Sequence, residues 1–365
     1  METKTGGRLA SLDALRGFDM FFIMGGQGLI YAIATALGHP DFKDSFGHVP
    51  WDGLHFVDTI FPLFLFIAGV TFPFSAAKRI EGGATQSRLV WHSIRRGLTI
   101  LLLGYICNGL LNFNFAKLRV YGVLQHIGFC WMVAALLFLA FRRNTRIVIA
   151  AALLVGSWLF FRFVGAPDAA GAPPFSPEGN LGCWIDRTLF GPPHIYRPLF
   201  DPEGAATVLP GIVMPMLGMF AGEFLRSGMS GGRKAALLAV AGVASAAAGL
   251  LMSLSIPIVK ALWSSSFVLV AGGYSAVMLA LFYWIIDVKG WSKWTFFFKV
   301  IGMNSITIYL GQRIIPFTPI RNFFLNGTVA LLPDTIGAIV NAAGYIAVCW
   351  LFLYFLYRKN TFLKV

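Results

Sequence analysis

Charged residues are scarce in this chain of 365 residues, where they make up 12%, against about a quarter in a typical soluble domain. Hydrophobic residues make up 57% and gather in runs near 20 residues long, which is the length that a helix needs to cross a bilayer. The short alternating segments of an outer-membrane barrel do not occur. The composition therefore predicts an all-α, polytopic integral membrane protein.

Cysteines are also few, and several sequence motifs are missing. The four cysteines are scattered without a metal-binding or redox spacing, so we expect neither a metal site nor a structural disulfide. Phosphate-loop, dinucleotide-binding and nucleophile-elbow patterns do not occur. There is no internal repeat, which is the usual signature of a transporter. No cleavable signal peptide is expected, because the first apolar run is long and contains Asp19.

The net charge of +13 is better explained by membrane orientation than by nucleic-acid binding, because basic residues gather in the short gaps between apolar runs. About ten spanning helices are predicted, near 14–37, 53–77, 93–111, 121–141, 146–164, 207–226, 234–254, 263–286, 295–312 and 330–356. Alternate gaps hold 20 of the 29 basic residues. The positive-inside rule then places both termini in the cytoplasm. We expect one transmembrane domain over 1–365, with a non-cytoplasmic loop at about 165–206.

The most informative stretch is 47–75, where polar side chains stand at the mouth of an apolar run. Asp58 lies about five residues inside that run, roughly 7–8 Å below its start. A carboxylate at that depth usually faces a protein interior or a water-filled cavity. His48 lies outside the run and is a natural general base if a carboxylate orients it. Either Asp52 or Asp58 could be that partner, and Trp51 lies between them.

Three further stretches carry polar residues that are unusual in membrane helices. The segment 119–128 contains Gln125 and His126, the segment 259–267 places Lys260 and Trp263 before three serines, and the segment 302–313 contains Asn304 and Ser305. Serine and threonine in such helices usually serve packing. A buried asparagine has four hydrogen-bonding valences to fill. Asn304 and Ser305 are candidates for donors to a developing oxyanion, and the whole set suits acyl transfer.

At these stretches the chain resembles the heparan-α-glucosaminide N-acetyltransferase family, including bacterial relatives that acetylate amino sugars. The resemblance covers nearly the whole chain and keeps the family's order of motifs. These motifs are SLDALRG from Ser11, HVPWDGLHFVDTIFPLFLFIAG from His48, RVYGVLQHIG from Arg119, FDPEGAATVLPGIVMPMLGMFAG from Phe200, KALWSSSF from Lys260 and IDVKGWSKWTFFFKVIGMNSITIYLG from Ile286.

The resemblance implies transfer of acetyl groups from cytoplasmic acetyl-CoA to a terminal glucosamine across the membrane. The family's active histidine falls on His48 and its acid on Asp58. The family's polar residue late in the first helix falls on Gln27, where the lysosomal enzyme has asparagine, and its arginine falls on Arg119. By the resemblance, we expect the chain to lack the large N-terminal lumenal domain of the lysosomal enzyme. An acetyl-histidine intermediate and direct transfer in a ternary complex both remain open.

The sequence therefore predicts a transmembrane acetyltransferase in the bacterial inner membrane that uses acetyl-CoA, needs no metal, and acts on glucosamine or a small glucosamine-containing saccharide. His48 and Asp58 are the expected catalytic residues. The expected partners are the two substrates, the lipid bilayer and, by the resemblance, a second copy of the chain, but no nucleic acid. The alternatives are an O-acyltransferase of an envelope glycan and a sugar or peptide permease without chemistry. The expected binding residues are Gln27, Trp51, Asp52, Arg119, Gln125, Lys260, Trp263, Asn304 and Ser305.

Overall fold

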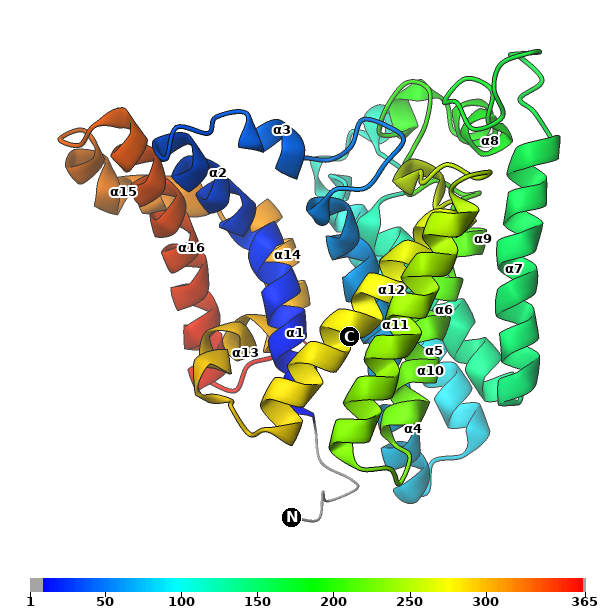
Figure 1. Ribbon diagram of the computed structural model, residues 1–365. Coiled ribbons are helices and arrows are strands. Elements are labelled where there is room, and N and C mark those ends of the chain that lie inside the picture. Colours follow the sequence, from blue (N-terminus) through cyan, green and yellow to red (C-terminus); the bar gives the residue numbers. More distant parts are fainter. Residues whose placement is uncertain (1–8, 364–365) are drawn as a thin grey trace.

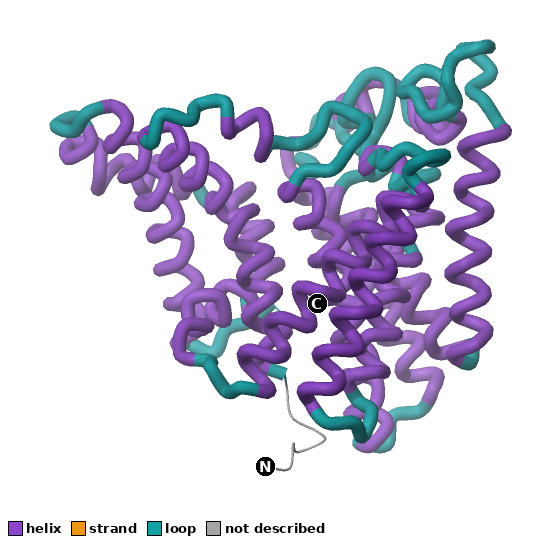
Figure 2. Tube along the Cα trace, viewed as in Figure 1, coloured by secondary structure: helices purple, strands orange, loops and turns teal. Residues whose placement is uncertain are grey.

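The computed structural model describes residues 9–363, and the basic residues at 1–8 and 364–365 lie outside this range. Helices form almost all of it, and the described part contains no strand (Figure 2). The helices are α1 (Ala10–Phe21), α2 (Gln27–Ala36), α3 (Phe42–Phe46), α4 (Ile60–Glu81), α5 (Gln86–Cys107), α6 (Val123–Ala140), α7 (Arg143–Phe163), α8 (Leu181–Leu189), α9 (Val208–Gly211), α10 (Val213–Leu225), α11 (Gly231–Met252), α12 (Ser265–Phe282), α13 (Phe296–Met303), α14 (Ser305–Ile314), α15 (Phe317–Val329) and α16 (Asp334–Arg358).

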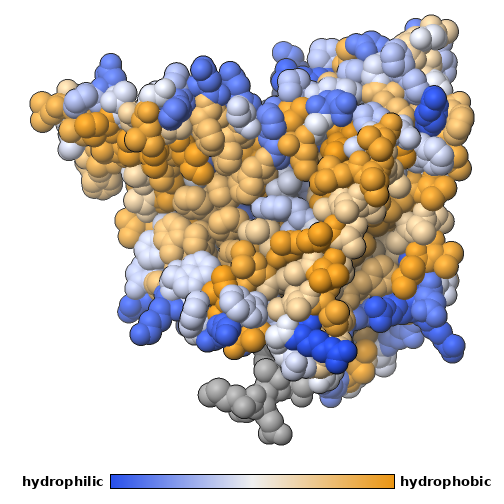
Figure 3. Space-filling view, in the orientation of Figure 1, coloured by the Kyte–Doolittle hydropathy of each residue, from blue (hydrophilic) through white to orange (hydrophobic). Residues whose placement is uncertain are grey.

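Eight helical segments in the described range are long and apolar enough to cross a membrane. They confirm an all-α polytopic membrane protein. The surface in Figure 3 has an apolar belt between two hydrophilic rims, as expected of side chains that face lipid tails at mid-height and water at either end. Figure 1 places α3 and α8 at the upper rim, and the loop after α4 at the lower rim.

Two of the ten expected spans are not among these eight segments. The expected span at 93–111 is α5, which begins earlier, at Gln86, and includes His92, Arg95 and Arg96 among its apolar residues. The expected span at 295–312 is divided into α13 and α14, because the backbone leaves helical geometry at Asn304, where φ is −126° and ψ is 30°. In Figure 1, α13 lies near the lower rim and α14 above it. The count of ten crossings therefore stays a prediction.

Glycines allow some of these helices to pack backbone against backbone. A Cβ atom added to Gly218 of α10 would lie 2.1 Å from the carbonyl oxygen of Phe66 in α4. One added to Gly17 of α1 would lie 1.8 Å from the carbonyl oxygen of Phe298 in α13. Small residues at helix contacts are the usual way in which membrane helices approach closely. The α4–α10 contact lies in the largest core cluster, which includes the fully buried Phe66 and Trp131.

The segments at the upper rim are more ordered than a plain connection. The loop expected at 165–206 contains α8, whose first turn is capped by the Asn180 side chain accepting from the Gly182 N–H at 2.9 Å. The Arg187 guanidinium of the same helix donates to Asp168 and to the Glu178 carbonyl. The expected loop after 312 contains α15, which packs against α16. The 165–206 segment therefore contains a capped helix that side-chain contacts hold to the rest of the segment.

Candidate active site

The imidazole of His48 forms a short hydrogen bond with the buried carboxylate of Asp58, with 2.6 Å between Nδ1 and Oδ1. Lys260 Nζ lies 3.1 Å from each of these two atoms. The His48 side chain is 61% exposed, whereas the side chain of Asp58 is 2% exposed. The site is therefore an accessible imidazole anchored to a buried acid, with an ammonium group against both.

Local backbone structure fixes this acid at the mouth of α4. The Asp58 carboxylate accepts from the backbone N–H groups of Val49, at 3.3 Å, and His55, at 3.1 Å. The His55 bond is half of a capping box on the short 3₁₀ turn Phe56–Thr59 that leads into α4. The His55 ring bonds the carbonyl of Gly47, one residue before His48, at 2.7 Å. The sequence around the acid thus folds the loop back so that His48 reaches it.

Lys260 reaches the site through a short antiparallel pairing of two loops. The Gly53 N–H donates to the Ile258 carbonyl at 2.9 Å, and Asp52 and Val259 form an isolated β-bridge. Gly53 has a φ of 119°, a conformation that favours glycine. Lys260 then begins a 3₁₀ turn that precedes α12. The pairing joins the two loops at one point, next to His48.

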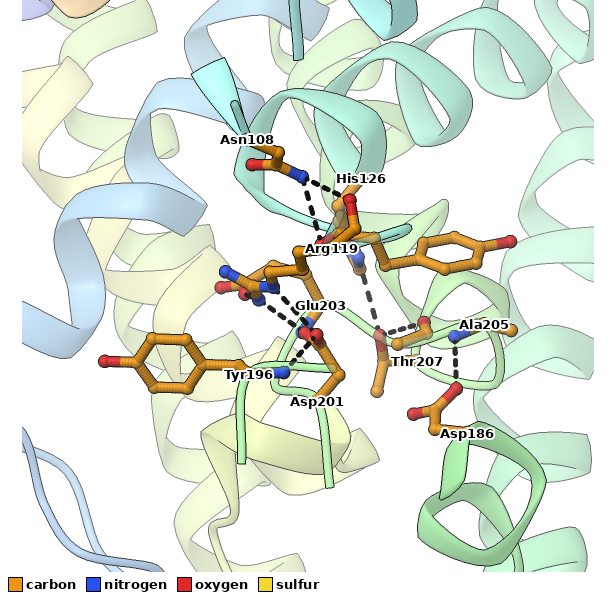
Figure 4. Close-up of polar contacts among 11 residues, drawn as sticks. Asn108, Arg119, His126, Asp186, Tyr196, Asp201, Glu203, Ala205 and Thr207 are labelled. Carbon is orange, nitrogen blue, oxygen red and sulfur yellow. Dashed lines mark hydrogen bonds and ion pairs between the residues drawn. The ribbon is translucent and has the colours of Figure 1, made fainter. Parts of the chain in front are cut away.

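A second cluster of charged groups surrounds Arg119 at the same rim (Figure 4). Arg119 Nε donates to Asp201 Oδ2 at 2.8 Å, and its Nη2 donates to Asp201 Oδ1 and Glu203 Oε2. The guanidinium also lies over the Tyr196 ring, 4.8 Å from its centroid. Glu203 interacts electrostatically with Lys260, so this arginine cluster adjoins the histidine site. The two together form one polar region above the apolar core.

Burial shapes the acid–base properties of the cluster at the rim. Burial alone would lower the pKa of Arg119, but its hydrogen bonds and charge interactions with Asp201 and Glu203 outweigh that effect and raise the pKa above its ordinary value. Burial raises the pKa of Glu203, although the Arg119 guanidinium acts in the opposite sense. Burial raises the pKa of Asp186 to about 7, while it accepts a hydrogen bond from the Ala205 N–H. Ionised Arg119 is therefore strongly favoured, which keeps the arginine cluster intact.

Comparison with known proteins places this geometry in a family. The family model described as heparan-alpha-glucosaminide N-acetyltransferase, catalytic, matches residues 8–256, including His48, Asp58 and Arg119. The chain belongs to the heparan-α-glucosaminide N-acetyltransferase family.

Two curated relatives carry the family's name. The human heparan-alpha-glucosaminide N-acetyltransferase is 28% identical over an alignment 426 positions long, which covers 98% of this chain and 60% of the human protein. The mouse heparan-alpha-glucosaminide N-acetyltransferase is 27% identical, and the alignment covers 98% of this chain and 61% of the mouse protein. The chain thus spans about three fifths of the length of these relatives.

The structure distinguishes between Asp52 and Asp58 as the partner of His48. The side chain of Asp52 is exposed, and its backbone pairs with Val259, so the carboxylate that contacts His48 is that of Asp58. Trp51 donates its indole N–H to the Phe175 carbonyl at 2.7 Å, and its ring lies against Phe200. Trp51 therefore joins the 165–206 segment to the loop that carries His48, and a binding role for it stays a prediction.

The other expected binding residues lie at different depths. Gln27 begins α2 and donates to the hydroxyl of Tyr31 at 2.5 Å. Tyr31 in turn approaches Gly47, because a Cβ there would lie 3.7 Å from the hydroxyl oxygen. Gln125 is buried against Gly104 of α5, and neither atom of its amide has a partner among the described residues. Gln27 is thus linked to the His48 loop through Tyr31, whereas Gln125 faces a helix contact.

The segment after Lys260 serves mainly structural roles. Trp263 is fully buried and stacks on the His126 ring, with 4.5 Å between the ring centroids. The Ser264 hydroxyl caps α12 and donates to the Pro257 carbonyl at 2.8 Å, and that of Ser266 donates to the same carbonyl at 2.9 Å. The position of Trp263 gives no support to its expected contact with a substrate. The packing role usual for serines holds for this group.

Asn304 and Ser305 lie deeper, at the break between α13 and α14. Asn304 Oδ1 accepts from the Thr307 hydroxyl at 3.3 Å, while its Nδ2 is buried without a partner among the described residues. Ser305 lines a narrow cavity of about 30 Å³, enough for one or two waters. The cavity walls come from α1, α4, α6 and α14 and include Met20, Phe61, Ile127 and Tyr309. No contact of the described residues joins Asn304 or Ser305 to His48.

Asp201 and Glu203 were not among the residues expected from sequence, although both contact Arg119. The signal that could have found them is charge complementarity. Arg119 is one of few basic residues expected at the outer ends of the helices, and the acidic pair stands in a loop expected on the same side. A buried or half-buried charge is costly unless a charge of opposite sign compensates it, so Arg119 and the acidic pair stabilise one another at this rim.

Proposed function

We propose that this chain transfers the acetyl group of acetyl-CoA to the amino group of glucosamine or a small glucosamine-containing saccharide. The observation that carries the proposal is the accessible His48 imidazole bonded to buried Asp58, in a chain of the heparan-α-glucosaminide N-acetyltransferase family. The whole activity is a proposal because the chain spans about three fifths of its curated relatives. The proposed reaction uses no metal ion.

His48 acts as the general base in this mechanism. With Nδ1 engaged by Asp58, Nε2 is the ring nitrogen that accepts a proton from the acceptor amine. The amine nitrogen bonds to the thioester carbonyl carbon, the carbon–sulfur bond breaks, and the CoA thiolate leaves and takes up a proton. In the alternative with an acetyl-histidine, the imidazole nitrogen first attacks the thioester carbonyl carbon and the CoA thiolate leaves. The acceptor amine then attacks the acetyl carbon and displaces the imidazole. Both sequences need the same neutral ring with a free Nε2.

The donor reaches the site from the cytoplasmic side in this proposal. Its nucleotide is too highly charged to enter hydrocarbon, so only the slender pantetheine arm passes between the helices. The cavity lined by Phe61, Ile127 and Tyr309 lies along that route, between the outer polar region and the inner ends of the helices. At about 30 Å³ it must widen to admit the arm.

Basic residues at the inner end are the proposed holders of the phosphates. The guanidinium of Arg96 in α5 lies over the Trp131 ring, 4.2 Å from its centroid, and its Nε has no partner among the described residues. Trp131 lies one helical turn after Ile127, which lines the cavity. Arg79 of α4 lies nearby and bonds His92 at 3.0 Å. These positions favour Arg96 as the first phosphate contact. The other proposed holders of the phosphates are Arg95, Arg142, Arg143, Lys289 and Lys293.

We further propose an orientation with both termini in the cytoplasm of a bacterial cell and with His48 at the periplasmic face of the inner membrane. The split of basic residues between the two rims supports this orientation. The homodimer expected from the resemblance stays a prediction. The mass of the detergent-solubilised protein, measured by light scattering, tests it.

The experiment that tests the function measures free CoA released by the purified protein, with and without glucosamine. An N-acetyltransferase releases CoA when glucosamine is present and forms N-acetylglucosamine in equal amount. An O-acyltransferase releases CoA with N-acetylglucosamine as well, whose amine is blocked but whose hydroxyls remain free, and with glucosamine it forms an O-acetyl product. A permease without chemistry releases none with either acceptor, and that result would overturn the proposal.

A further inference from the structure

The ammonium group of Lys260 lies where it contacts both members of the His48–Asp58 pair, at 3.1 Å from His48 Nδ1 and 3.1 Å from Asp58 Oδ1. The Lys260 side chain is 21% exposed, so it is largely enclosed at this position. Its backbone lies 202 residues from that of Asp58 along the chain. The pairing of the two loops at Asp52 and Val259 brings the groups together.

Asp58 is saturated with donors in this arrangement. Its two oxygens face His48 Nδ1, Lys260 Nζ and the backbone N–H groups of Val49 and His55. An ionised carboxylate has about four lone-pair positions and no proton to give. Each of these positions therefore has a partner, and Asp58 can act only as an acceptor. Nδ1 of His48 must then carry the ring proton of the neutral imidazole.

This assignment determines what Lys260 contributes. Nδ1 already donates to Asp58, so it cannot also accept from the ammonium group, and the bond of Lys260 goes to Asp58 Oδ1. Its charge compensates that of the buried carboxylate, which would otherwise favour a second proton on His48. The charged groups that face Lys260 among the described residues are His48 from the loop before α4, Asp58 from the 3₁₀ turn that leads into α4, and Glu203 from the loop before α9.

We propose that Lys260 is a positioning residue for the reaction: it fixes Asp58 and compensates its charge, so that His48 is held neutral with Nε2 free for the acceptor amine. The inference rests on the proposed function, because it concerns the base of that reaction. It differs from the substrate-binding role expected from the sequence, since it assigns Lys260 to the histidine–aspartate pair. It also predicts that Lys260 acts on turnover and its pH dependence.

The test compares Lys260→Met, Lys260→Arg and Lys117→Met in steady-state kinetics from pH 5.5 to 9. Lys117 is an exposed lysine in the loop before Arg119, so Lys117→Met controls for the loss of one positive charge at this rim. Lys260→Met should lower kcat at pH 7 about tenfold or more, with both KM values within about twofold of the parent. The acidic limb of its kcat/KM profile should move to higher pH by about one unit. Lys260→Arg should return that limb toward its original position.

Other outcomes would overturn the inference. A raised KM with an unchanged kcat would make Lys260 a substrate-binding residue, and an unmoved pH profile with lower kcat would make its role structural. Should Lys260→Met not fold, Lys260→Gln and Lys260→Arg give the same comparison of pH profiles. His48→Ala is measured alongside: if it keeps full turnover, the proposed base fails, whereas an inactive His48→Ala with an unaffected Lys260→Met overturns only the inference about Lys260.

Discussion

At the scale of single residues, the spacing of polar groups carried more information than their number. The sequence left Asp52 and Asp58 as alternatives, and burial separates them: the exposed Asp52 pairs through its backbone, while the buried Asp58 holds His48. The sequence could pair residues ten positions apart, but not Asp58 with Lys260, 202 positions away. That contact depends on how two loops pack together, which no local sequence pattern predicts.

The exposed base predicts a selective loss on its removal. His48→Ala should leave the protein folded, because the ring is largely exposed, and should lower turnover by roughly 10²–10⁴-fold, as expected for a lost general base. Asp58→Asn should also lose turnover, and some stability, since an amide places a donor among four donors.

The measurements for these variants are CoA release and the melting temperature in detergent. His39→Ala is the matched control, as an exposed histidine at the same rim that should keep parental turnover. Near-normal turnover of His48→Ala would remove it from the mechanism, and His55 or His126 would be the next candidates.

Asp186 predicts a pH dependence of stability. Its pKa is raised to about 7 in the folded protein from the ordinary 3.8. Below about pH 4 the group is protonated in both states; between about 4 and 7 the unfolded chain releases the proton that the folded chain retains. Its contribution to stability is therefore lost as the pH rises to about 7. Asp186→Asn should abolish this loss.

Melting temperatures at pH 5 and pH 8 test the expectation for Asp186. From pH 5 to pH 8, the melting temperature of Asp186→Asn should rise by a few degrees relative to that of the parent. Asp41→Asn, at an exposed position of the same rim, serves as the control. An equal shift in both variants, or none in Asp186→Asn, would contradict the assignment.

At the scale of elements, apolar runs identified most helices, because length and hydropathy are local properties. The break between α13 and α14 at Asn304 was not predicted, since the uncharged polar residues Asn304 and Ser305 do not by themselves end an apolar run. The α8 helix was missed for a different reason. At nine residues it is too short to give a membrane signal, and tertiary contacts of Arg187 and Asn180 hold it.

The close contact of α4 with α10 makes Gly218 intolerant of a side chain. A Cβ there would lie 2.1 Å from the Phe66 carbonyl oxygen, and backbone atoms cannot move aside without separating the helices. Gly218→Ala should therefore cost about 1–3 kcal/mol, the usual range for overpacking. Gly156→Ala in α7 is the matched control, because nothing lies within 4 Å of its added Cβ. Thermal unfolding in detergent compares them; an equally stable Gly218→Ala would contradict the contact.

At the scale of the whole molecule, the two rims should lie on opposite sides of the membrane. Cysteines introduced at Ser45 and Ala170, both exposed at the rim that bears His48, should react with a membrane-impermeant maleimide in right-side-out vesicles. One at the exposed Ser230, at the opposite rim, should react only after permeabilisation. The parent protein, with its native cysteines, gives the background. The reverse pattern would invert the orientation and the proposed sidedness of the site.

The same orientation determines where each substrate must be supplied. If the nucleotide is held near Arg96 and only the pantetheine arm enters the cavity, acetyl-CoA can act from the cytoplasmic side alone. Right-side-out vesicles loaded with acetyl-CoA should acetylate glucosamine added outside, while empty vesicles given both substrates outside should not. Arg96→Leu should raise the KM for acetyl-CoA, whereas Arg162→Leu, an exposed arginine of α7 at the outer rim, should leave it unchanged. Equal activity with the donor on either side would contradict the threading route, because an acetyl-CoA site open to both sides needs no passage through the helices.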